Sequence, residues 1–124
     1  MELFFNFTEK RLDLLRKDKL LKLKKKNRGN LKLFKAIDRL INDIEKSEWK
    51  NKLDVVESRH DADSVYGDNF FFFDLNVHRT MTLILFCEQT VEILWVGNHD
   101  EYEKTFKGNK STIETWLRNH GKIK

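Results

Sequence analysis

The stretch FFFFDLNVHRTMTLILFCEQTVEILWVGNHDEYEKTF, residues 70–106, decides the fold of this chain. It contains three apolar runs, Phe70–Leu75, Arg79–Phe86 and Val91–Val96, whose aromatic and β-branched content is typical of strands. Only three or four residues separate one run from the next. Such short links join antiparallel neighbours, because parallel strands need a long crossover. The stretch therefore predicts a small antiparallel sheet.

The region before this sheet predicts a helical hairpin. Thr8 is a good N-cap, and we expect a first helix that begins at Glu9 and stops near Gly29. Its inward leucines are Leu12, Leu15, Leu20 and Leu23. Asn30 starts a second helix, whose apolar residues recur with a helical period. These residues are Phe34, Ile37, Leu40, Ile41 and Ile44. The short turn between the two helices makes them antiparallel neighbours.

Residues 47–69 follow no clear period. Here we expect Val55–Val56 to form a short edge strand. Residues 59–64 are predicted to cross the molecule as a polar segment, and residues 66–69 to form a turn.

Two helix starts are expected after the third strand. Asn98 is predicted to cap a short helix with acidic residues in its first turn. Further on, Ser111 and Glu114 have the spacing of a capping box, and Gly121 is placed to stop the terminal helix. The first strand is apolar on both faces, so we expect helices to cover one side of the sheet. The fold class is therefore α+β: an N-terminal helical hairpin on a small twisted antiparallel sheet of three to four strands, with a C-terminal helix. Residues 1–124 are expected to form a single domain.

Composition places the protein among globular chains with a basic half. Residues 1–60 carry 17 Lys and Arg against 10 Asp and Glu, and residues 61–124 carry 7 against 10. This asymmetry suggests a surface for an anionic polymer, or simply a solvated helical face. The single Cys87 excludes an internal disulfide and suits a reducing compartment. Neither a signal peptide nor a membrane-spanning run is evident, so we expect a cytoplasmic protein with no membrane partner.

Arg79 is the first candidate for chemistry, since it begins a strand that is otherwise uncharged down to Phe86. A guanidinium held by a rigid strand suits bidentate binding of phosphate. The structural alternative is a salt bridge across the hairpin to Asp74, because cross-strand pairs of opposite charge are common.

His99 and Tyr102 are the other candidates. His99 directly follows the third strand, and the imidazole pKa of about 6.5 suits proton transfer at neutral pH. Alternatively, His99 is a helix cap or a surface histidine. Tyr102 lies three residues further along, on the same helical face, where it would hydrogen-bond a phosphate or stack on a base.

Metal and cofactor motifs are weak in this sequence. The four histidines are scattered, with no HExxH and no cysteine pair, and there is no P-loop or Rossmann fingerprint. They are His60, His78, His99 and His120. A magnesium site at Asp100, Glu101 and Glu103 is conceivable, but these carboxylates also suit a helix N-terminus. We therefore expect no metal and no cofactor.

Two short motifs resemble the HigB-type toxins of the RelE/ParE superfamily. They are Asn76-Val77-His78-Arg79 and Gly97-Asn98-His99-Asp100-Glu101-Tyr102-Glu103. In that family an Asn-x-x-Arg at the strand turn precedes a Gly-Thr-His-x-x-Tyr-Asp after the last strand. The resemblance spans roughly residues 60–106. This chain departs from the family pattern at Leu75, where Gly is common, at Asn98 in place of Thr, and at Glu103 in place of Asp.

The resemblance implies the toxin of a type II toxin–antitoxin system, a metal-independent and ribosome-associated mRNA endoribonuclease. It also implies two partners, mRNA on the ribosome and a cognate helix-turn-helix antitoxin. RNA cleavage without a metal uses the 2′-hydroxyl as nucleophile, so the protein supplies proton transfer and a cation for the developing charge. We assign His99 to proton transfer, Arg79 to charge stabilisation and Tyr102 to orientation. A second acid–base partner is not evident.

Lysines are expected to hold the RNA backbone in this interpretation. Near the site these are Lys104, Lys107 and Lys110, and at the end of the first helix they are Lys22, Lys24, Lys25 and Lys26. The second group equally suits the C-terminal end of a helix dipole. Two other functions stay open, because fold does not fix function. One is a ParE-like poison of gyrase or another protein target, and the other is a non-catalytic nucleic-acid-binding module.

Overall fold

The computed structural model describes residues 12–124, and its centre is a five-stranded mixed sheet. The strands lie in the order β1-β5-β4-β3-β2, and all neighbours are antiparallel except β1 and β5. Their bounds are β1 Asp13–Leu15, β2 Asp63–Tyr66, β3 Phe70–Leu75, β4 His78–Leu85 and β5 Thr90–Asn98. The three strands predicted in residues 70–106 and their antiparallel order are confirmed.

Two edge strands extend the sheet beyond the prediction. β2 pairs with the start of β3 and buries Val65, although its residues suggested a polar crossing. The edge strand expected at Val55–Val56 is wrong, because these residues belong to the helix α4, Lys52–Ser58. The Asn51 side chain caps α4 by accepting a hydrogen bond from the Asp54 N–H, and α4 turns Val55 inward while Val56 stays exposed.

The helix predicted from Glu9 to near Gly29 is wrong over residues 12–17 and confirmed only over Asp18–Lys26. Thr8, its expected cap, and residues 9–11 lie outside the described residues. Asp13–Leu15 form β1, parallel to Thr90–Glu92 of β5, and the helix α2 spans only Asp18–Lys26. Pairing with β5 places Leu12 in the core but leaves 46% of Leu15 exposed.

The hairpin of α2 and α3 (Leu31–Lys46) is confirmed. Gly29, with φ +86°, lies in the connection, and the Asn30 side chain accepts a hydrogen bond from the Leu33 N–H. The buried face of α3 consists of Leu33, Ile37, Leu40, Ile41 and Ile44. Phe34, expected on that face, is half-buried at its border.

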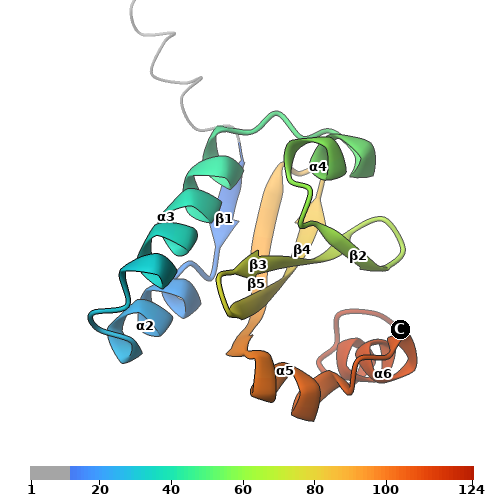
Figure 1. Cartoon of the computed structure of the whole chain (residues 1–124). Coiled ribbons are helices and arrows are strands. Elements are labelled where there is room, and N and C mark those ends of the chain that lie inside the picture. The colour runs from blue at the N-terminus through green and yellow to red at the C-terminus, as the bar shows by residue number, and fades with distance from the viewer. Residues whose placement is uncertain (1–11) are drawn as a thin grey trace, which may run out of the picture.

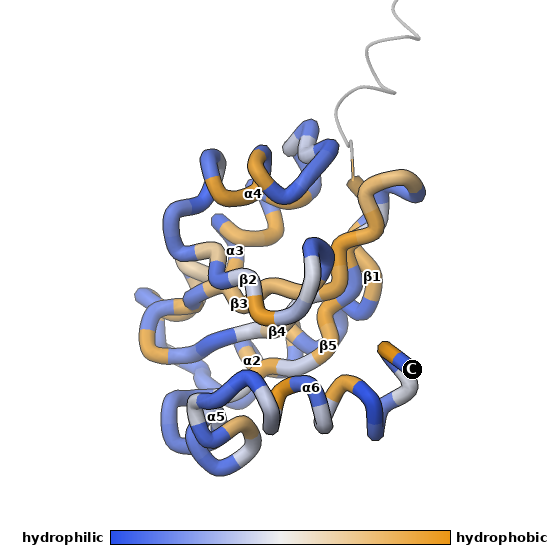
Figure 2. Tube along the Cα trace, turned by 90° about the vertical axis from the view of Figure 1, so that its right-hand side faces the viewer, coloured by the Kyte–Doolittle hydropathy of each residue, from blue (hydrophilic) through white to orange (hydrophobic). Residues whose placement is uncertain are grey.

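Helices cover both faces of the sheet, so the expectation of helices on one side only is wrong and there are two cores. Phe71, Phe73 and Leu75 of β3 pack with α2, α3 and α4, whereas Phe70 and Phe72 pack with α5 (His99–Phe106) and α6 (Lys110–Asn119). Figure 1 shows α2 and α3 side by side, with α5 and α6 apart from them below the sheet. In Figure 2 the hydrophobic colour is continuous along much of the strands and alternates with hydrophilic colour along the helices. The α+β fold class is therefore confirmed.

The helix starts after β5 are defined by asparagine caps. Asn98 and Glu101 form the capping box of α5, as the sequence predicts for Asn98. For α6 the predicted box at Ser111 is wrong. Asn109 is the cap instead, because its side chain accepts a hydrogen bond from the Thr112 N–H. Gly121, with φ +71°, follows the end of α6.

Candidate functional site

Arg79 lies on β4, opposite Gly97 of β5, and is bound by two carboxylates. Its Nε donates to Asp74 Oδ1 at 3.2 Å, and its Nη2 lies 3.5 Å from Asp63 Oδ2. The salt bridge to Asp74, the structural alternative raised from the sequence, is therefore present. Both carboxylates are about half exposed, at 56% and 52%, whereas the Arg79 side chain is 23% exposed.

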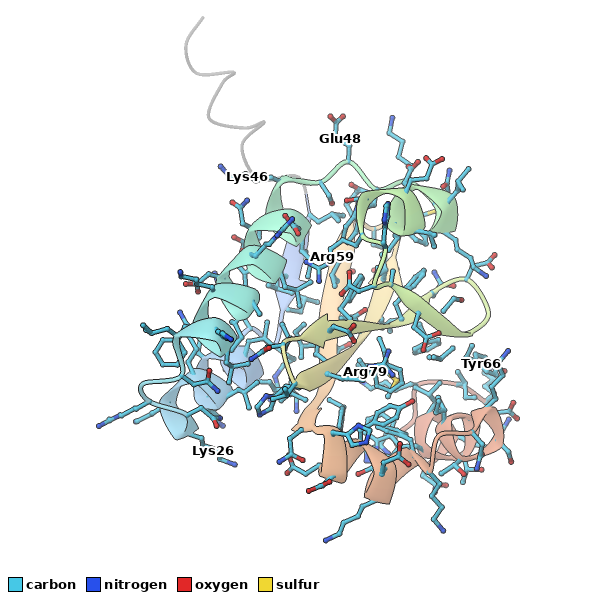
Figure 3. The ribbon with its side chains drawn as sticks, viewed as in Figure 1. Lys26, Lys46, Glu48, Arg59, Tyr66 and Arg79 are labelled. Atoms are coloured by element: carbon cyan, nitrogen blue, oxygen red, sulfur yellow. The ribbon has the colours of Figure 1, made fainter. Side chains whose placement is uncertain are left out.

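The Arg79 guanidinium also lies between two aromatic rings. Its central carbon is 4.9 Å from the ring centroid of Phe72 and 4.9 Å from that of Tyr102. Both distances are within the range of cation–π attraction. Figure 3 shows Arg79 between the sheet and α5. The structure thus brings together two of the three predicted site residues, Arg79 and Tyr102.

Tyr102 is held in place by an aromatic cluster. Its ring packs edge-on against Phe72 at 5.2 Å between centroids and lies 5.7 Å from Phe106 and 6.4 Å from Trp95. Tyr102 is half-buried, so one part of the ring is fixed while the rest stays accessible. Such packing fixes the orientation of the Tyr102 ring.

His99 is the first residue of α5 and is exposed. Within residues 12–124 no side-chain hydrogen bond, ion pair or ring contact joins His99 to Arg79 or to Tyr102. His99 is near these two residues only because of its place in the sequence, two residues after Gly97 and three before Tyr102. The catalytic roles of these residues stay predictions.

Gly97 is required by the packing of its neighbours. A Cβ atom at this position would come within 2.6 Å of the Cζ2 and Cη2 atoms of Trp95, and within 3.1 Å of the Glu101 Cβ. The Trp95 indole therefore lies against the Gly97 backbone. Gly97 is the residue of β5 that pairs with Arg79 of β4. Glycine at this point lets β5 run straight into α5.

The lysine cluster of α2 divides into separate groups. Lys24 Nζ is 2.6 Å from Asp38 Oδ1 and lies over the Phe34 ring, so it links α2 to α3. Lys22 and Lys26 line a groove beside β5, together with Lys19. Lys25 is exposed and is not among the lining residues of that groove.

The lysines predicted near α5 and α6 are exposed but scattered. Lys104 lies in the last turn of α5, and Lys107 ends that helix in a left-handed conformation with φ 52°. Lys110 opens α6 and lines a different hollow, with Lys52 and Tyr66. Within the described part of the chain, the carboxylates that bind Arg79, Asp63 and Asp74, form no ion pair with these three lysines.

His78 is the residue that sequence reasoning missed. It is 8% exposed, and its Nδ1 is buried without a hydrogen-bond partner among the described residues. Burial lowers the pKa of His78 below its ordinary value of 6.5, and the nearby Glu101 carboxylate only partly offsets that effect. The available signal was the strand period, which puts His78 and Arg79 on opposite faces of β4.

Carboxylates near the site have structural partners. Glu101 Oε1 accepts a hydrogen bond from the Asn98 N–H within the capping box, which supports the helix N-terminus interpretation of this acidic turn. Across residues 12–124 no group of three or more His, Cys, Asp or Glu residues is arranged to hold a metal ion. Within the same residues no helix is long and apolar enough to cross a membrane.

Comparison with known families agrees with the motifs. A model of the HigB toxin family, described as the RelE-like toxic component of a toxin–antitoxin system, matches residues 34–105. No curated protein matches the chain significantly. The matched region includes most of α3, all of α4, the strands β2 to β5 and all of α5 but its last residue, and so contains Arg79, His99 and Tyr102. The chain therefore belongs to the HigB toxin family, the RelE-like toxic components of toxin–antitoxin systems.

Proposed function

We propose that this toxin is a metal-independent endoribonuclease that cuts mRNA on the ribosome. The observation that carries the proposal is the pairing of Arg79 with Tyr102, at 4.9 Å, beside the start of α5. A cation held against an aromatic ring at the open end of a sheet suits a ribose–phosphate chain, because it offers both charge and a stacking surface.

The chemistry needs no group from outside the RNA and the protein. The RNA 2′-hydroxyl loses its proton and attacks the adjacent phosphorus, the bond to the 5′-oxygen breaks, and that oxygen takes up a proton. The products are a 2′,3′-cyclic phosphate and a 5′-hydroxyl. Arg79 stabilises the developing charge, His99 transfers a proton, and Tyr102 orients the nucleotide.

The ion pairs of Arg79 are compatible with this role. They use Nε and Nη2, so the Nη1 donors are left for a phosphate among the contacts of the described residues. Lys104 and Lys107 would hold the RNA backbone beyond α5, and Lys110 would do so at the start of α6. We place the activity in the cytoplasm, where mRNA is translated, and expect a helix-turn-helix antitoxin to suppress it.

A non-catalytic role is favoured by one specific observation. Two carboxylates already neutralise Arg79, as they would in a purely structural residue. In that case the protein is a nucleic-acid-binding module or a ParE-like poison of a protein target. Both alternatives predict that RNA stays intact in cells whose growth the toxin arrests.

The test measures cleavage of a defined mRNA by purified protein, with and without ribosomes. We expect Arg79→Ala and His99→Ala to lower the rate about 10²–10⁴-fold, the usual cost of losing a group that acts in proton transfer or charge stabilisation. Arg118→Ala and His60→Ala are the matched controls, since both residues are exposed and lie outside the site. Full activity in folded Arg79→Ala and His99→Ala would refute the site.

Metal dependence and product ends form a separate prediction. A chelator is expected to leave cleavage unchanged, and the products are expected to carry cyclic or 3′-phosphate ends, which end-specific labelling detects. Products with 3′-hydroxyl ends and a magnesium requirement would contradict the proposed mechanism.

A further inference from the structure

The edge of β5 is only partly covered by another strand. β5 spans Thr90–Asn98, but β1 pairs with Thr90–Glu92 alone. Beyond that point a groove of about 670 Å³ follows the strand edge, with α2 on one side and α6 on the other. Leu94 to Asn98 form its floor, and part of its wall is formed by Trp116 of α6 and by His120, which directly follows that helix.

The α2 side of this groove is a row of cations. Lys19, Lys22 and Lys26 follow one another at intervals of three and four residues, so they share one helix face. None of the three has an ion-pair partner among residues 12–124, whereas the neighbouring Arg16 is paired with Asp18 at 3.1 Å. The three lysines give the groove an excess of positive charge, although the carboxylates of Asp18 and Glu101 also line it.

His78 is the polar group at the floor of the groove. It is more than nine-tenths buried, and its small exposed part faces the groove that it lines. Nδ1 is sealed off without a partner among the described residues, which leaves Nε2 as the ring nitrogen that a ligand can reach.

The groove is continuous with the candidate active site. Asn98 and Glu101 line it, and Glu101 directly precedes Tyr102. His78 pairs with Asn98 just as the adjacent Arg79 pairs with Gly97. Because successive residues of a strand point to opposite faces, His78 and Arg79 reach the two faces of the sheet at the same end of β4.

We propose that this groove binds a single-stranded RNA segment that flanks the cleaved bond, with its phosphates along Lys19, Lys22 and Lys26 and one nucleotide in contact with His78. The proposal rests on the proposed function for the RNA, and it adds a second binding site at the uncovered edge of β5, between α2 and α6. Cations beside Trp95, Trp116 and His120 favour RNA, since nucleic acid pairs charge with base stacking. An acidic peptide added to the bare edge of β5 is the competing occupant.

The test measures binding of a fluorescent 2′-O-methyl oligoribonucleotide, which cannot be cleaved because its 2′-oxygens are blocked. Lys22→Gln/Lys26→Gln is compared with Lys25→Gln/Lys32→Gln, a control that removes the same charge from exposed lysines outside the groove. We expect the groove variant to flatten the slope of log affinity against log salt by about 1.4, since each contact to a single strand contributes about 0.7. The control should keep nearly the wild-type slope. Equal changes in the two variants, or no oligonucleotide binding by the wild type, would overturn the proposal.

His78→Leu tests the floor of the groove. It removes the imidazole but keeps an apolar side chain, so folding is preserved and thermal melting verifies this. We expect oligonucleotide affinity to fall roughly two- to tenfold, as for one lost hydrogen bond. Unchanged affinity in the folded variant would remove His78 from the site and contradict the proposal.

Two further measurements separate the possible failures. If the wild type cuts no RNA but the groove variants weaken oligonucleotide binding selectively, the proposed function fails and the groove stands. If the wild type cuts RNA and the groove variants match their control, the groove alone fails. A poly-glutamate peptide is the probe for the competing occupant. Groove substitutions that weaken peptide binding but leave oligonucleotide binding intact would assign the groove to a protein partner.

Discussion

Arg79 combines contacts that differ in strength and in what they leave accessible. Its carboxylate partners are about half exposed, and ion pairs of that kind contribute only about 0–1 kcal/mol. Phe72 and Tyr102 hold the guanidinium plane by contacts that a phosphate would not displace. The two ion pairs therefore orient the Arg79 side chain and still leave it available to bind a phosphate. This arrangement is what the proposed role in charge stabilisation requires.

At the residue scale, Gly97→Ala tests the fit between β5 and α5. The new methyl group would lie 2.6 Å from the Trp95 ring, so the indole or the backbone must move. Overpacking of this kind typically costs about 1–3 kcal/mol of unfolding free energy. Urea denaturation measures it, and Trp95→Phe in the same chain is expected to recover part of the loss because the smaller ring gives way. A stability equal to wild type would show that the contact is not tight.

At the scale of elements, α5 is a short helix that depends on its cap. With only eight residues it is too short to be stable alone, so the capping box and its packed face define it. Phe106 buries its C-terminal end, and Tyr102 faces Arg79 from its middle. The position of Tyr102 thus depends on the cap at Asn98.

Asn98→Ala is the corresponding prediction. Loss of the side chain that accepts from the Glu101 N–H is expected to cost about 0.5–2 kcal/mol and to increase amide exchange in α5. Asn109→Ala is the control, since it removes the equivalent cap from α6. The two variants should lose similar stability, but only Asn98→Ala should lower RNA cleavage. Equal activity in both variants would separate Tyr102 from the cap.

At the scale of the whole molecule, one partly buried ion cluster joins three elements. Arg59 is 11% exposed and donates to Asp43 of α3 at 2.9 Å and to Asp61 at 2.6 Å (Figure 3). Asp61 in turn accepts from the Asp74 N–H of β3 at 2.8 Å. The guanidinium also lies 5.5 Å from the Phe73 ring centroid. The cluster ties the α3–α4 side of the fold to the sheet.

This cluster predicts how stability depends on acid. Burial acts to raise the pKa of Asp61, but the hydrogen bonds from Arg59 and from a backbone N–H outweigh it, so the pKa lies below its ordinary 3.8. A carboxyl with a lowered folded-state pKa adds stability above its unfolded pKa, and that stability is lost as the pH falls through the folded pKa. We therefore expect Asp61→Asn to be less stable than wild type at pH 7 by about 1.5–3 kcal/mol, the range for a hydrogen bond to a charged group.

Chemical denaturation from pH 7 down to pH 2 measures this difference. It should shrink below about pH 4, because Asp61 of the wild type then becomes neutral as well. Asp68→Asn is the control, since Asp68 is 79% exposed and its 3.9 Å pair with Lys52 is weak. A gap that stays constant over the whole range would mean that the charge of Asp61 is not what stabilises the fold.

Patterns that repeat over several turns or residues were readable from the sequence alone. The helical period of its apolar residues predicted α3, the second helix of the hairpin. The apolar runs predicted β3, β4 and β5, the centre of the sheet. Both patterns are readable because the burial of apolar side chains dominates the energetics of these elements. The cap at Asn98 and the turn at Gly29 were likewise local. The motif around Arg79 and Tyr102 named two side chains that do lie together.

Short and ambiguous segments were decided only by tertiary structure. Asp13–Leu15 is a strand because β5, about 77 residues away in sequence, offers it a parallel partner, whereas the same leucines also fit a helix. Val55 lies in a helix because Asn51 caps it and the core takes its side chain. The groove and the buried His78 required the actual placement of α2 and α6 around the edge of β5, since no local pattern specifies what a strand edge meets. Local propensities of three to seven residues are worth too little free energy to outweigh such long-range contacts.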